Sequence, residues 1–306
     1  MISTQELFRL IKGPIAVAEP LAPYTGLRIG GTADYFIKPR DRGDLCRAFG
    51  YFSERGLPFF ILGRGSRLLV HEQGFRGTVI ATHLLDRVIV DGYTVEADAG
   101  ASVQALFDRA AKASLGGLDG FGAGAGTVGG ALCRADGSGN GCESLEWVDV
   151  LHNGRAKRLR NGELHSRMAR RSLAADVILG AGFRLEKLSG RARHSAPAPV
   201  PEPAASPQPA LSGKVFLDPV PLTGQEQPGA AELLDACGLR GASRGGATFS
   251  HTDANRILNN GEATSADVLG LVRHAGETVR ERFGVRLELG LVLVGYNTNG
   301  SHVPFT

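Results

Sequence analysis

Two glycine-rich stretches contain the residues of this sequence whose types and spacing are best suited to chemistry. Residues 120–131 read Gly-Phe-Gly-Ala-Gly-Ala-Gly-Thr-Val-Gly-Gly-Ala, and residues 63–70 read Gly-Arg-Gly-Ser-Arg-Leu-Leu-Val, directly after the apolar run 59–62. Glycine has no side chain to hold a ligand away, so main-chain N–H groups in such loops can surround a phosphate or pyrophosphate. The pair of loops therefore predicts a nucleotide cofactor.

Each loop also has a simpler interpretation, because a lone glycine cluster is more often a tight turn between strands. Two such loops in one chain, one of them behind a strand-like run, favour the cofactor. The arginines of the second loop either pair with phosphate or are solvated surface charges. The residues expected to bind the cofactor are Gly63, Arg64, Gly65, Ser66, Arg67, Leu68, Gly126, Thr127, Val128, Gly129 and Gly130.

Hydrophobic periodicity indicates the elements that must position these loops. Ser102 is a suitable N-cap, and Thr264 with Asp267 resembles a capping box. Helices with one apolar face are expected over residues 43–55, 102–115 and 265–282, and a closing strand over 285–294. Hairpins are predicted where Asp91-Gly92 and Asn153-Gly154 separate alternating apolar runs. This mixture of strands, hairpins and helices predicts an α+β protein.

A proline-rich segment divides the sequence. Residues 189–211 contain six prolines among alanine, serine and valine, a composition that cannot bury a core and favours extended polyproline conformations. We expect a linker or disordered insert there, with one domain over residues 1–188 and another over 212–306. The same segment is a possible docking site for a protein partner.

Composition excludes several classes of function. The 306 residues are 42% hydrophobic and carry a formal net charge of only +3, which argues against nucleic-acid binding as the main task. The four cysteines lack CxxC spacing and histidine companions, so no metal site or disulfide framework is expected. Residues 1–12 lack the apolar core of a signal peptide, and no run reaches membrane-spanning length, so a cytoplasmic protein is expected.

The sequence resembles the UDP-N-acetylenolpyruvoylglucosamine reductase family from about residue 21 to residue 295, apart from the proline-rich insert. The most specific motifs are Gly-Thr-Val-Gly-Gly-Ala at 126–131 and the glycine loop at 63–70, with Ala-Cys-Gly-Leu-Arg-Gly at 236–241 in the C-terminal half. The resemblance implies a p-cresol-methylhydroxylase-type FAD-binding domain followed by a smaller α+β substrate domain. It also implies FAD as cofactor and NADPH as hydride donor for a UDP-sugar enolpyruvate in peptidoglycan precursor synthesis.

The resemblance also implies where the catalytic residues lie. Hydride addition to the enolpyruvyl group leaves enolate character that a family arginine and glutamate stabilise, and a family serine protonates carbon 2. Arg170 stands at the arginine position in Ala-Arg-Arg-Ser, which lacks the family tyrosine. Lys214 stands at the serine position, and a local register change could bring Ser212, two residues before it, to that position. Gly290 stands at the glutamate position, which leaves Glu288 as the nearest carboxylate on the same strand face.

A further departure affects substrate binding. Asp218 replaces the family asparagine, and its carboxylate would repel an anionic substrate unless a cation such as Lys214 pairs with it. Two hypotheses follow. The chain is either a divergent FAD reductase of this family, or a catalytically impaired or re-purposed FAD-binding homologue with a scaffold role or another substrate.

Overall fold

The structure, a computed structural model, describes residues 4–119, 121–122, 126–133, 143–169, 172–188, 210–219 and 228–296. The chain forms two compact units that interleave along the sequence, here called the first unit and the second unit. The first comprises Met1–Val17, Tyr35–Arg64 and Gly77–Val200, and the second comprises Ala18–Asp34, Gly65–Arg76 and Pro201–Thr306. A single boundary in the proline-rich segment therefore separates most of the two units but misses the two N-terminal stretches of the second.

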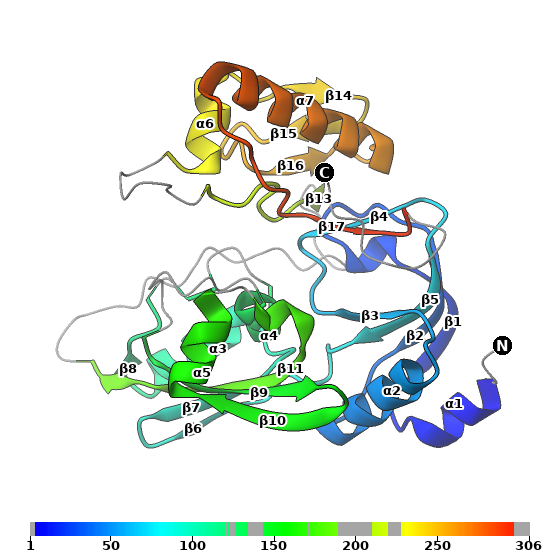
Figure 1. Cartoon of the computed structure of the whole chain (residues 1–306), viewed down its shortest axis with the longest axis vertical. Coiled ribbons are helices and arrows are strands. Elements are labelled where there is room, and N and C mark those ends of the chain that lie inside the picture. The colour runs from blue at the N-terminus through cyan, green and yellow to red at the C-terminus, as the bar shows by residue number, and fades with distance from the viewer. Residues whose placement is uncertain are drawn as a thin grey trace. The chain divides into compact units, whose positions relative to one another are not determined.

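The first unit contains an antiparallel five-stranded sheet in the order β10-β9-β11-β7-β6 (Figure 1). Both predicted hairpins are confirmed, because β6 pairs with β7 across Asp91-Gly92 and β9 pairs with β10 across Asn153-Gly154. Asn153 and Gly154 have φ of 47° and 74°, as a tight hairpin turn requires. The strands are β6 (Val88–Asp91), β7 (Thr94–Asp98), β9 (Leu145–His152), β10 (Arg155–Arg160) and β11 (Val177–Arg184).

Helices cover one face of this sheet. The apolar sides of α3 (Val103–Lys112), α4 (Val128–Leu132) and α5 (Asn161–Ala169) pack with the strands in one buried cluster (Figure 1). The predicted cap of α3 is confirmed, since Ser102 Oγ accepts a hydrogen bond from Ala105 N at 3.0 Å. The short pair β8 (Leu115–Gly116) and β12 (Glu186–Lys187) and the 3-10 turn η2 (Ser172–Ala175) complete this part of the chain.

A second, four-stranded sheet has the order β1-β2-β5-β3, in which β3 and β5 are parallel. The predicted helix at 43–55 is confirmed as α2, which begins after its N-cap Asp41. Buried residues of α1 and α2 pack against this sheet and against Leu151 and Leu179 of the five-stranded sheet. The elements are α1 (Thr4–Leu10), β1 (Ile15–Pro20), η1 (Ala22–Tyr24), β2 (Thr32–Ile37), α2 (Arg42–Glu54), β3 (Phe59–Leu62) and β5 (Phe75–Ala81).

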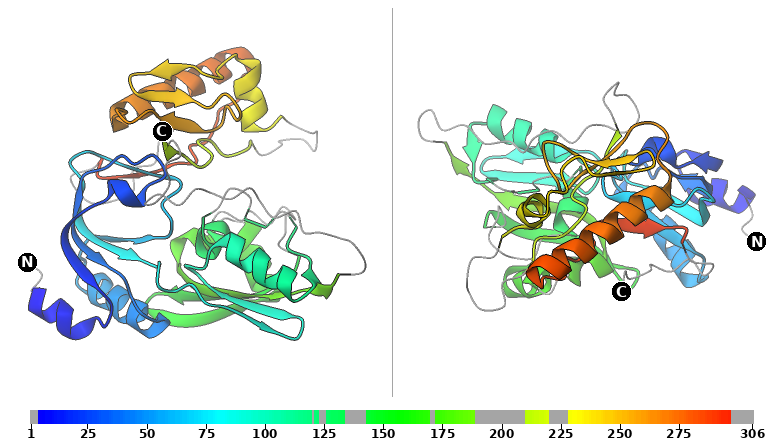
Figure 2. Two further views of the ribbon diagram at one scale, coloured as in Figure 1. Left: turned by 180° about the vertical axis from the view of Figure 1, so that it is seen from behind. Right: turned by 90° about the horizontal axis from the view of Figure 1, so that it is seen from above.

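The second unit is a smaller α+β body whose sheet has the order β13-β16-β15-β14. Helix α7 runs across these short strands (Figure 2) and begins with the predicted capping box, in which Thr264 and Asp267 bond each other's backbone N–H groups. Strand β4 (Leu68–Val70) pairs in parallel with β17 (Val292–Val294) in the same unit. The remaining elements are β13 (Ala210–Leu211), α6 (Ala230–Ala236), β14 (Ser243–Arg244), β15 (Ala247–Phe249), β16 (Ile257–Asn259) and α7 (Ser265–Phe283).

Two expectations about strands need correction. The closing strand predicted over 285–294 is confined to β17, and the residues before it contribute a bridge between Leu289 and Phe216. The last two residues of the expected linker form β13, because they pair with β16. Among the helices of the described ranges, none combines the length and hydropathy needed to cross a bilayer.

Candidate active and cofactor-binding site

The two glycine stretches lie against each other within the first unit. A methyl group added to Gly63 would lie 2.8 Å from Thr127 Oγ1, and one added to Gly126 would lie 2.7 Å from Arg64 Cβ. Real side chains do not tolerate such distances, so both positions require glycine for steric reasons. The turn after β3 and the start of α4 therefore pack closely, with each glycine backbone against a side chain of the other stretch.

The backbone donors at the start of α4 are already used. Val128 N donates to Ala101 O at 2.9 Å, and Gly129 N donates to Ala99 O at 2.8 Å. Gly130 N donates to the Thr127 Oγ1 cap at 3.1 Å. The first two of these hydrogen bonds hold α4 to the segment before α3, and the third caps the helix. The glycines of this part of the stretch have no side chain to keep a ligand away from the backbone.

The remainder of the 63–70 loop lies in the second unit. Ser66 O accepts a hydrogen bond from Gly213 N at 2.6 Å, and Arg67 O accepts one from Val292 N at 2.7 Å. A methyl group on Gly213 would lie 2.5 Å from Arg67 Cγ, so the arginine stem covers this glycine. Leu68 is buried in β4. Ser66 and Arg67 thus support the segment that begins at Gly213 and leads to Lys214.

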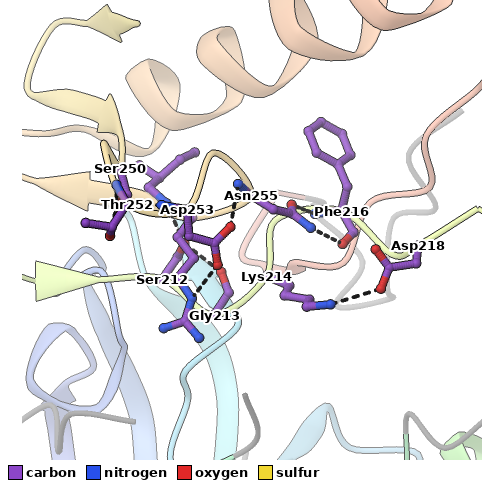
Figure 3. Close-up of polar contacts among 11 residues, drawn as sticks. Ser212, Gly213, Lys214, Phe216, Asp218, Ser250, Thr252, Asp253 and Asn255 are labelled. Atoms are coloured by element: carbon purple, nitrogen blue, oxygen red, sulfur yellow. Dashed lines mark hydrogen bonds and ion pairs between the residues drawn. The ribbon is translucent and has the colours of Figure 1, made fainter. Parts of the chain in front are cut away.

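Lys214 and Asp218 form an ion pair, as expected if the negative charge of Asp218 is not to repel an anionic substrate. Lys214 Nζ lies 2.9 Å from Asp218 Oδ2, and both side chains are partly exposed (Figure 3). The other carboxylate oxygen of Asp218 accepts a hydrogen bond from Ala230 N at 3.0 Å, in the first turn of α6. Asp218 therefore has a structural partner on each oxygen, and its charge is balanced locally.

The two positions at which catalytic residue types are replaced are neighbours. Gly290 N donates to Val215 O at 2.6 Å, and Leu217 N donates to Glu288 O at 2.9 Å, so residues 288–290 run beside 215–217. Gly290 is buried, and a methyl group on it would lie 2.9 Å from Lys214 O. Glu288 is exposed. The backbone thus brings Lys214 and Gly290 together and leaves little room for a side chain at position 290.

Comparison with known proteins identifies the family. Residues 33–165 match the family described as FAD binding domain, and residues 205–294 match the C-terminal domain of UDP-N-acetylenolpyruvoylglucosamine reductase. A protein of that name from Chloroherpeton thalassium is 35% identical over 97% of this chain and 98% of its own length. The chain belongs to the UDP-N-acetylenolpyruvoylglucosamine reductase family.

Other members of this reductase family agree with the assignment. The UDP-N-acetylenolpyruvoylglucosamine reductase 2 of Symbiobacterium thermophilum is 36% identical over 93% of this chain and 94% of its own length. The crystal structure of the reductase from Thermus caldophilus superposes with a TM-score of 0.65 at 26% identity and covers 93% of this chain and 99% of its own. The predicted resemblance and the fold class, an FAD-binding domain with a smaller C-terminal α+β domain, are thereby confirmed.

Some residues named in the sequence analysis lie outside the described part of the chain. Arg170, the expected catalytic arginine, lies outside the described residues, as do Gly120, residues 123–125 and the segment 189–209. Its assignment stays a prediction. Within the described part of the chain, no group of three His, Cys, Asp or Glu side chains gathers as a metal site would require.

Ser212 does not occupy the serine position of the family motif. Its side chain is buried, donates to Gly213 O at 2.7 Å and accepts from Ile257 N at 2.8 Å. Ser212 N also donates to Ile257 O at 2.9 Å. A register change that moved Ser212 toward position 214 would break all three hydrogen bonds, so the structure opposes such a change.

Asn255 is a residue of the site that the sequence analysis missed. Its buried side chain accepts from Phe216 N at 2.8 Å and donates to Phe216 O at 2.9 Å, as a neighbouring strand would (Figure 3). Its own carbonyl accepts from Val215 N at 2.8 Å. An asparagine shortly before a strand is typical of a turn. Its adjacency to Asp253, whose Oδ1 accepts from Asn255 N at 3.0 Å, is the one local signal, and it indicates a turn rather than this role.

Proposed function

We propose that this chain is an FAD-dependent reductase that uses NADPH to reduce UDP-N-acetylglucosamine enolpyruvate in the synthesis of peptidoglycan precursors. The observation that carries the proposal is the 35% identity to a UDP-N-acetylenolpyruvoylglucosamine reductase over 97% of the chain. Both parts of such an enzyme are represented, since separate family matches cover the FAD-binding domain and the reductase C-terminal domain.

The residues of the first unit suit FAD. A dinucleotide needs a surface on which backbone can approach its phosphates, and Gly63 and Gly126 provide positions where any side chain would collide with the opposite loop. Gly63, Arg64, Gly126 and Thr127 are the residues that would hold the cofactor. FAD, when bound, supplies the hydride chemistry, by accepting hydride from NADPH and passing it to the substrate.

The reaction needs positive charge and a proton donor at the substrate. Hydride addition to an enolpyruvyl group places negative charge on its carboxylate, and a fixed cation stabilises that charge. We assign this role to Arg170, and we assign to the Lys214 ammonium the role of proton donor that the family serine has. Asp218 would orient Lys214 through their ion pair, at 2.9 Å. Glu288 is the nearest carboxylate in sequence to position 290.

One observation favours a second candidate function. Gly290 is buried with backbone oxygens close to where a side chain would begin, so the site lacks the carboxylate of the family motif at this point. A re-purposed FAD-binding homologue, with another substrate or a scaffold role, would have this feature. The proline-rich segment would then be a docking site for a protein partner in the cytoplasm.

A sequential flavin experiment separates these functions. The purified protein is reduced with NADPH under anaerobic conditions, and UDP-N-acetylglucosamine enolpyruvate is then added while the yellow flavin absorbance is followed. We expect bleaching by NADPH and recovery of the colour with the sugar nucleotide. Bleaching without recovery would exclude this substrate and favour the re-purposed homologue. A protein that neither retains nor takes up flavin would contradict both.

A further inference from the structure

The two residues that follow β5, Thr82 and His83, form hydrogen bonds with the end of β3 and the Gly63 turn. Strands β3 and β5 are parallel with Leu62 opposite Ala81, so residues 63–64 and 82–83 leave the sheet at the same edge. Thr82 N and Thr82 Oγ1 donate to Leu62 O at 2.8 and 3.2 Å. The next residue, His83, places Nε2 2.9 Å from Gly63 O.

The histidine must be the donor in this contact. A backbone carbonyl oxygen only accepts hydrogen bonds, so His83 Nε2 carries the hydrogen. The ring also lies near the buried Phe36, with 6.5 Å between the ring centroids and an angle of 33° between the ring planes. His83 is thus a side chain with one face on the core and one nitrogen on the cofactor turn.

The hydrogen bond fixes a peptide plane. The bond between Gly63 and Arg64 is planar and trans, so the Arg64 N–H points opposite to the Gly63 carbonyl. While His83 holds that carbonyl, the Arg64 N–H is directed away from His83. Glycine at position 63 allows the peptide to rotate easily when this hold is lost. Thr127 packs closely against the turn, because a methyl group on Gly63 would lie 2.8 Å from Thr127 Oγ1.

We infer that His83 is a positioning residue for the FAD-binding turn. It sets the orientation of the Gly63–Arg64 peptide, and with it the backbone surface that the turn and Thr127 present to the cofactor. His83 touches neither substrate nor reacting atoms in this role. The inference rests on the proposed binding of FAD and concerns affinity for the cofactor rather than turnover.

Matched side chains at position 83 test the inference. Glutamine places its amide nitrogen about as far from Cβ as His Nε2, whereas asparagine reaches only as far as Nδ1. FAD is removed from the full-length chain, and its dissociation constant is measured by fluorescence titration for His83→Gln, His83→Asn and the wild type. We expect wild-type affinity for His83→Gln within about threefold, and for His83→Asn a dissociation constant about tenfold higher, equal to about 1.4 kcal/mol.

Thr82→Val is the control for general loosening of this edge. It removes one hydrogen bond to Leu62 O and leaves the hydrogen bond between His83 and Gly63 O in place. We expect it to lose about as much thermal stability as His83→Asn, but to change FAD affinity by less than about twofold. Equal affinities of His83→Asn and the wild type, or equal weakening by Thr82→Val, would overturn the role of His83. A wild-type chain that binds no FAD would instead overturn the proposed function, and this inference with it.

Discussion

Lys214 and Asp218 form an ion pair, with 2.9 Å between Nζ and Oδ2. The same aspartate accepts a hydrogen bond from Ala230 N at the start of α6. One carboxylate therefore has two tasks: it neutralises the cation that stands at the family serine position, and it supports a helix of the second unit. The two tasks can be separated by substitution, because an amide can perform the second but not the first.

Asp218→Asn is expected to lower the KM for the UDP-sugar by about two- to fivefold. Lys214 loses its anion and becomes available to the negatively charged substrate, whereas the amide oxygen still accepts from Ala230 N. Since the pair is exposed, the free energy of unfolding should change by less than about 1 kcal/mol. Steady-state kinetics and urea unfolding measure the two effects.

Asp218→Ala is the matched control for that prediction. It also releases Lys214 but removes the hydrogen bond to α6, and we expect it to cost about 1 kcal/mol of stability in addition. An unchanged or higher KM in Asp218→Asn would show that the ion pair does not compete with the substrate.

Gly290→Glu is expected to destabilise the second unit without raising turnover. Its Cβ would lie 2.9 Å from Lys214 O and 3.2 Å from Val215 O, so the 215–217 backbone must shift. Overpacking of this kind costs about 1–3 kcal/mol. Gly290→Ala introduces the same Cβ without a carboxylate and should lose a similar amount in thermal unfolding. Turnover that rises in Gly290→Glu at wild-type stability would be the opposite result.

Gly63→Ala should weaken FAD binding by about tenfold or more. The added methyl group would meet Thr127 Oγ1 at 2.8 Å and push apart the two loops of the first unit. Gly162→Ala in α5 is a suitable control, because no atom lies within 4 Å of its added methyl group. Alanine there should stabilise the helix by up to about 1 kcal/mol and leave FAD affinity unchanged. Equal FAD affinities of the two variants would remove Gly63 from the cofactor surface.

The ionisation of Asp44 should determine part of the loss of folding stability at acid pH. Burial opposes its ionisation, but hydrogen bonds from Lys12 N, Arg40 N, the Arg47 guanidinium and Gly13 N outweigh burial and hold the pKa of the carboxyl below its usual range. A folded-state pKa below the unfolded value stabilises the protein above about pH 4 and loses that stabilisation as the pH falls through the folded-state pKa.

Asp44→Asn should therefore cost about 2–3 kcal/mol at neutral pH, because an amide cannot accept all four hydrogen bonds. The difference in unfolding free energy between the variant and the wild type should shrink as the pH falls from about 7 to about 3. Urea unfolding at several pH values measures this difference. A gap that stays constant with pH would mean that the pKa of Asp44 is the same in the folded and the unfolded protein.

Local chemistry in the sequence determined much of the secondary structure. The turns at Asp91-Gly92 and Asn153-Gly154 and the caps at Ser102 and Thr264 depend on neighbouring residues only, and each is found where the sequence predicts it. The family also followed from the sequence, because its glycine motifs are contiguous. The extent of the closing strand did not, since a strand needs a partner that may lie anywhere in the chain.

Only the tertiary structure decided how backbone groups far apart in sequence meet. The glycine run lies against the 63–70 loop, and the sequence could not show that Val128 N and Gly129 N donate to Ala101 and Ala99. The adjacency of Lys214 and Gly290 and the hold of Asn255 on Phe216 are of the same kind. Side-chain types record which chemistry is available at a position, whereas the pairing of uniform backbone N–H and C=O groups is set by the path of the whole chain.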